Sequence, residues 1–225
     1  MIYTDADDNY RSLQQHFDGA LHGVIASESL HYLIEKQLPL LEAFFSDSDD
    51  IYERSKRFIR DYIRHSLEYF CALSTLSEMD NIHAYTRPYL GTAIDFFLVN
   101  TPKEDTDDST TASVAITDLL SQAYSFYRMI EELNDRVALE RQLPLAPIDL
   151  AYTNLIAHTI IGDDEANQLD QNVLIKLELT SAALADKTEA IFQNPATLAL
   201  TEQRREAGWQ DAYDKWPCLL NDISQ

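Results

Sequence analysis

The spacing of apolar residues between Thr111 and Arg141 constrains the fold more than any other feature of this sequence. Apolar side chains recur there at alternating steps of three and four, which is the pattern of a helix packed against other helices and not of a strand. They are Ile116, Leu119, Ala123, Phe126, Ile130, Leu133 and Val137. A hydroxyl residue at 109–111 is expected to cap the start of this helix, and Pro144 stops it soon after Arg141.

The acidic residues of this segment lie off its apolar stripe. Glu131, Glu132 and Asp135 fall on other faces of the helix, and Glu140 approaches the stripe only in the last turn. We therefore expect no carboxylate to point inward along the regular part of the helix.

Composition extends the helical interpretation to the whole chain. The 225 residues are enough to bury a full core, and they include only five valines and five glycines. Because leucine, alanine and glutamate are plentiful, this balance favours helix over sheet. We predict an all-α multi-helix bundle of about six to eight helices, either a single domain (1–225) or two closely packed helical halves. The halves would be 1–100 and 112–225, joined by the acidic linker 101–111.

Capping and stop signals place the expected helices. The sequence predicts a helix that reaches at least Ala26, a change of phase near Ser27, and a second helix with a kink or a fresh start at Pro39. A long helix over 51–79 follows the acidic run at 46–50. Later helices are expected from Pro88 to about Asn100, from Asp149 to Ile161, from Asp163 to Asn194, and as one last amphipathic helix ending at Pro217.

Charge and motif content exclude several classes of function. Seventeen Lys and Arg face 38 Asp and Glu, a net charge of −21, which repels the phosphates of nucleic acids and anionic lipids. Direct nucleic-acid binding is therefore not expected. There is no glycine-rich phosphate-binding motif, and two cysteines are too few for a disulfide framework. No run of eighteen apolar residues and no leader peptide occurs, so we expect a cytoplasmic protein that does not enter a membrane.

Glu28, His31 and Glu35 are the candidate metal ligands, with the spacing E-x-x-H-x-x-x-E. On a continuous helix they share one face, so the segment resembles half of a ferritin-like di-metal carboxylate site. That resemblance implies an oxidoreductase holding iron or manganese. The second Glu-x-x-His pair of such a site has its nearest match in the Asp-Asn-Ile-His run at 80–83. If instead the apolar stripe after Ser27 is buried, Glu28 and Glu35 turn toward water.

Arg60 and His65 form an R-x-x-x-x-H pattern on an expected helix. The pattern resembles the short motif of the HEPN family, helical dimers that include metal-independent ribonucleases, and it implies that Arg60 and His65 are catalytic at a dimer cleft. The alternative is an ordinary local ion pair, because His65 lies one turn from Asp61 and Glu68.

The interpretation that we favour is a non-enzymatic helical module that binds another protein, without a cofactor. Acidic clusters at helix starts and links would steer a basic partner. Trp209, Tyr213 and Trp216 near the C-terminus are the predicted interaction residues, since aromatic side chains of this kind anchor interfaces. The same anchors would serve a homodimer.

Overall fold

The computed structural model describes residues 28–45, 50–98 and 116–219 of the chain. Within these ranges the chain forms eight α-helices, one 3₁₀ turn and no strand. They are α2 (Glu28–Leu41), α3 (Ile51–Met79), α4 (His83–Leu98), α5 (Ile116–Arg141), α6 (Ala151–Ile161), α7 (Asp163–Phe192), α8 (Pro195–Ala207), α9 (Gln210–Lys215) and η2 (Pro217–Leu219). This confirms the predicted all-α multi-helix bundle. The expected linker 101–111 and the first expected helix lie outside the described residues.

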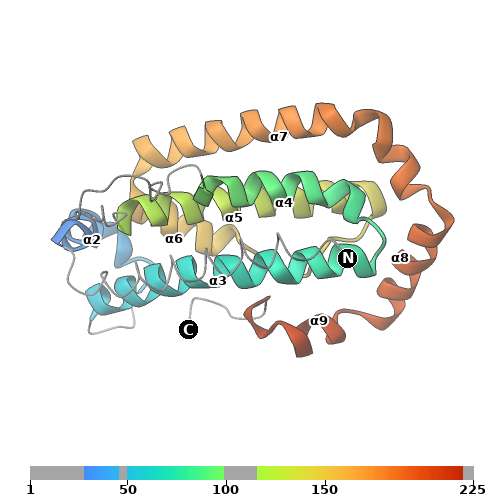
Figure 1. Ribbon diagram of the computed structural model, residues 1–225. Coiled ribbons are helices and arrows are strands. Elements are labelled where there is room, and N and C mark those ends of the chain that lie inside the picture. Colours follow the sequence, from blue (N-terminus) through green and yellow to red (C-terminus); the bar gives the residue numbers. More distant parts are fainter. Residues whose placement is uncertain (1–27, 46–49, 99–115, 220–225) are drawn as a thin grey trace, which may run out of the picture.

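Helix α5 lies in the middle of the bundle (Figure 1) and contacts α2, α3, α4, α6 and α7. The long helix α7 runs along one side of the bundle and α3 along the other, with α4 and α5 between them. Helix α8 then descends one end of the molecule from α7 to α9. None of the described helices is long and apolar enough to cross a membrane.

The predicted apolar stripe of α5 is buried along its whole length. Burial also extends beyond the stripe, because the helix has neighbours on several sides. The additional buried side chains of α5 are Leu120, Gln122, Tyr124, Ser125, Tyr127, Met129, Asn134 and Arg141. Internal partners stabilise the buried polar groups of a helix enclosed in this way, since water does not reach them.

Three expected helix boundaries differ from the structure. Pro88 lies inside α4, which begins at His83, and Pro39 lies inside α2, which continues to Leu41. Both prolines are within the first or last two turns of their helices, so each removes only one backbone hydrogen bond near an end. The last expected helix is divided into α8 and α9, because Gly208 adopts a positive φ of 73° that ends α8.

The enclosure of α5 predicts a large difference between two leucines on that helix. Leu133 is fully buried and Leu139 is 81% exposed. Leu133→Ala should lower the free energy of unfolding by about 2–5 kcal/mol, because it leaves a cavity in the core. Leu139→Ala should lower it by about 0.5 kcal/mol or less. Urea unfolding followed by circular dichroism measures both, and equal effects would show that α5 is not enclosed.

Candidate functional site

Two of the three candidate metal ligands, His31 and Glu35, lie on the outer side of α2. His31 Nε2 and Glu35 Oε1 form an ion pair of 2.9 Å, and their side chains are 53% and 59% exposed. Helix α2 instead buries Leu30, Ile34 and Leu41, so the stripe that follows Ser27 is the one that faces the core. The structure does not describe the side chain of Glu28. In the described ranges, no group of three or more His, Cys, Asp or Glu residues could hold a metal ion.

Arg60 and His65 both lie on α3, and each has an acidic neighbour on the same helix. Arg60 Nε bonds Asp61 Oδ1 at 3.2 Å, and His65 Nδ1 lies 2.8 Å from Glu68 Oε2. These contacts match the local ion-pair interpretation of the motif. The ribonuclease hypothesis stays a prediction.

The predicted interaction residues at the C-terminus are half-buried rather than fully exposed. Trp209 and Trp216 pack against the hydrophobic core, and Tyr213 is also half-buried. The guanidinium of Arg204 lies 4.9 Å from the ring centroid of Trp209, and Lys215 Nζ lies 5.7 Å from that of Trp216. Each tryptophan ring therefore already contacts other residues of the chain, which leaves less of it available to a partner.

A polar network joins α5 to α6 and α7 through the hydroxyl of Tyr124. This hydroxyl donates to the Asp170 carboxylate at 3.1 Å and lies 3.2 Å from His158 Nδ1. Arg128 Nε donates to the same carboxylate at 3.0 Å. Burial, reinforced by the charge of Asp170, raises the pKa of Tyr124. The phenol therefore stays protonated and serves as a donor rather than as a base.

The network continues along α5 through Glu131, which corrects the expectation that no carboxylate turns inward there. Glu131 is half-buried and forms an ion pair with Arg128. It also accepts a 2.7 Å hydrogen bond from Asn154 Nδ2, and Asn154 Oδ1 accepts one of 2.7 Å from the buried Tyr62 hydroxyl. Burial disfavours the charged form of Arg128 and acts to lower its pKa. The neighbouring carboxylates of Glu131 and Asp170 favour the charged form more strongly, so the pKa of Arg128 is raised. The hydrogen-bond partner of Glu131 outside α5 thus comes from a neighbouring helix, and the apolar pattern of α5 alone does not predict it.

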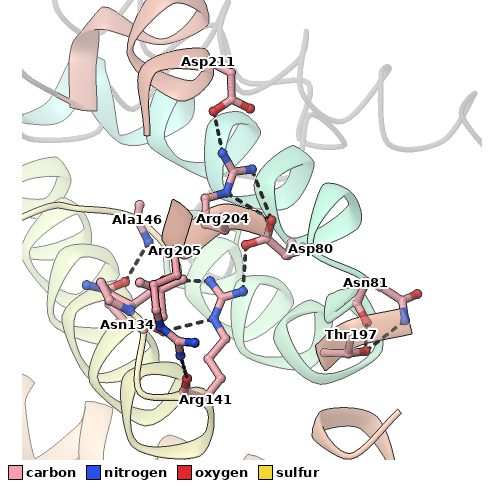
Figure 2. A network of polar contacts seen from close by, with 12 residues as sticks. Asp80, Asn81, Asn134, Arg141, Ala146, Thr197, Arg204, Arg205 and Asp211 are labelled. Carbon is pink, nitrogen blue, oxygen red and sulfur yellow. Dashed lines mark hydrogen bonds and ion pairs between the residues drawn. The ribbon is translucent and has the colours of Figure 1, made fainter. Parts of the chain in front are cut away.

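A second cluster is centred on Asp80, which caps the C-terminus of α3 (Figure 2). Arg141 Nη1 bonds Asp80 Oδ2 at 2.7 Å, and Arg204 Nη2 bonds Asp80 Oδ1 at 3.1 Å. Arg204 also pairs with Asp211 in α9. Burial lowers the pKa of Arg141, while Asp80 counteracts this effect. The cluster ties α8 and α9 to the ends of α3 and α5, and its buried groups have internal partners, so we interpret it as structural.

The candidate functional site is a pocket between α4, α5 and α7, with a volume of about 470 Å³. One face of α5 and one face of α7 line it, together with Phe96 near the end of α4. The lining residues are Phe96, Asp118, Ser121, Gln122, Ser125, Glu165, Leu169, Asn172, Ile175 and Lys176. The Ser121 hydroxyl donates to Glu165 Oε1 at 2.8 Å and so links α5 to α7 at this site.

The charged groups of the α4/α5/α7 pocket are two carboxylates and one ammonium group. Asp118 and Glu165 are exposed, and Asp118 has no ion-pair or hydrogen-bond partner in the described part of the chain. Lys176 Nζ lies 4.1 Å from the ring centroid of Phe96, and it forms no ion pair with any described residue. Asp163 and Asp164 add exposed negative charge at the start of α7. The surroundings therefore favour a cationic group over an anionic one.

An exposed apolar ridge extends along α7 beside the pocket. It consists of Ile175 and Leu179, which are 59% and 68% exposed, and Ile175 also lines the pocket. Leu174 is 48% exposed but lies on another side of the helix, because residues one or five positions apart do not share a face. Two large exposed apolar residues one turn apart are more than a core-facing stripe requires. Our sequence interpretation missed this site, although the surplus of apolar residues in 174–179 was visible in the sequence.

Comparisons of the chain with protein-family models, curated proteins and solved structures found no match.

The burial of Asp80 predicts that removing its charge lowers the free energy of unfolding more than removing the charge of an exposed carboxylate does. Asp80→Asn should lower the free energy of unfolding by about 3 kcal/mol, because the buried guanidinium groups of Arg141 and Arg204 lose their shared counter-charge. Asp186→Asn, at an exposed position on α7, is the control and should change it by less than about 0.5 kcal/mol. Thermal and urea unfolding provide the comparison. A stable Asp80→Asn protein would show that the cluster does not hold the ends of the bundle together.

Proposed function

We propose that the protein is a non-enzymatic, cytoplasmic interaction module that binds a basic amphipathic segment of a partner protein in the α4/α5/α7 pocket. One observation carries this proposal: at this site an exposed apolar ridge lies beside two carboxylates, and the Asp118 carboxylate has no partner among the residues that the structure describes. The two polar clusters described above are less suitable binding sites because their buried groups already have partners within the chain.

The ridge supports an apolar contribution to binding. Ile175 and Leu179 are one helical turn apart, so a helical segment laid beside α7 would cover both side chains. Phe96 and Leu169 are half-buried in the adjoining pocket and would extend the apolar surface inward. Removing such apolar surface from water contributes roughly 25 cal/mol for each Å², and the entropy lost on association offsets part of this gain.

The acidic groups support the choice of a basic partner. Lysine or arginine side chains of a bound segment would approach Asp118 and Glu165, while its apolar side chains contact the ridge. The net charge of −21 would attract such a segment over longer distances and accelerate association at low ionic strength. The same carboxylates would repel the phosphates of RNA and DNA, so a nucleic acid is a less favourable partner.

Two synthetic peptides of opposite charge test the proposal. A fluorescent 14-residue amphipathic helix of Leu and Lys should bind the protein at low salt, and its Leu and Glu counterpart should not. Asp118→Lys combined with Glu165→Lys should weaken binding of the Leu and Lys peptide about tenfold, because two attractions become repulsions. Fluorescence anisotropy measures the affinity.

The matched control is Asp186→Lys combined with Glu206→Lys, which changes the net charge equally at exposed positions outside the pocket. This control should weaken binding by less than about threefold, through the overall field alone. Equal losses in the two double variants would contradict the assignment of binding to the pocket. Equal binding of both peptides would contradict a basic partner.

A further inference from the structure

We propose that Lys176 is an internal occupant of a cation-binding position on the ring of Phe96, and that a lysine or arginine side chain of the partner displaces it. This inference rests on the proposed function and specifies how the α4/α5/α7 pocket recognises its partner. Lys176 would then lower the affinity of the pocket for its partner, because its ammonium group competes with an incoming cation for the ring of Phe96.

The geometry of Phe96 and Lys176 supports this assignment. Their separation of 4.1 Å, from Nζ to ring centroid, is within the range of an attractive cation–π contact. Among the contacts of this kind in the described residues, it is the shortest. Both residues line the pocket, so the ring face that holds the ammonium group belongs to the proposed binding surface.

The ammonium group of Lys176 is held only weakly. Among the described residues it has no carboxylate partner, and the contact that displacement breaks there is the one with the Phe96 ring. The flexible lysine side chain allows the ammonium group to move into water without a change in the backbone of α7. An incoming cation would gain the same ring contact, and the segment that carries it would also cover the exposed side chains of Ile175 and Leu179. The exchange therefore favours a cation carried by a bound segment.

Lys176→Gln tests the displacement with n-butylammonium chloride, a small cation that resembles a lysine side chain. Chemical shifts of the backbone amides of Ser125 and Asn172, both in the pocket, report binding, with sodium chloride at matched ionic strength as the reference. Lys176→Gln should bind n-butylammonium about threefold more tightly than the wild type, because the ring is vacant. Lys176→Arg, which retains the charge, should behave as the wild type does.

Two further variants distinguish the effect of the Phe96 ring on n-butylammonium affinity from the effect of net charge. Phe96→Leu in the Lys176→Gln background should abolish the gain in affinity, because leucine lacks the negative face of the aromatic ring. Lys187→Gln removes the same charge at an exposed position on α7 and should not increase affinity. Lys176→Met provides a second charge-removing variant if Lys176→Gln is unstable.

The inference is overturned if removal of the Lys176 charge does not tighten n-butylammonium binding, or if the gain persists without the Phe96 ring. Failure of the proposed function is a distinct result. In that case neither synthetic peptide binds selectively at the pocket, while the response to n-butylammonium still follows Lys176 and Phe96.

Discussion

The enclosure of α5 by its neighbours is the constraint on which the rest of the structure depends. A helix with one buried stripe can leave its polar residues in water, but α5 also buries Tyr124, Asn134 and Arg141. Each must be paired inside the protein, because an unpaired buried donor costs roughly 1–3 kcal/mol and a buried charge more. The Tyr124 network and the Asp80 cluster satisfy this requirement for Tyr124 and Arg141, and Asn134 Oδ1 accepts a hydrogen bond from the backbone amide of Ala146. They fix α6, α7 and α8 around α5 through specific polar contacts.

Helix α7 connects this scaffold to the proposed function. Its inner face includes the buried Val173 and Leu177, and Asp170 pairs with partners on α5, so its position is fixed. Its outer face nevertheless presents Ile175 and Leu179 to solvent. A rigid helix that exposes apolar side chains beside carboxylates offers a preorganised surface, and preorganisation lowers the entropy lost on binding. We therefore attribute recognition to α7 and stability mainly to α5.

Local sequence patterns predicted much of the fold and little of the site. The bounds of α3 followed from an acidic cap and a continuous apolar stripe, and the end of α6 followed from Gly162. Contacts between distant residues were not predictable in this way: Asp80 pairs with Arg204 across 124 positions, and neither residue has a local signature for the pairing. Likewise, the α4/α5/α7 pocket is formed by three helices. Their relative rotation is set by side-chain packing between them, which local sequence patterns do not specify.

Site-specific photo-crosslinking from the pocket shows which segment the pocket binds in cells. A photoreactive residue replaces Asn172, which is exposed and lines the pocket, and in a control protein it replaces Gln203, which is exposed on α8. After irradiation in native cells, crosslinked peptides are identified by mass spectrometry. We expect position 172 to crosslink selectively a segment of another protein that combines lysine or arginine with apolar residues. Crosslinking to an acidic segment, to a second copy of this chain, or equally from position 203 would contradict this expectation.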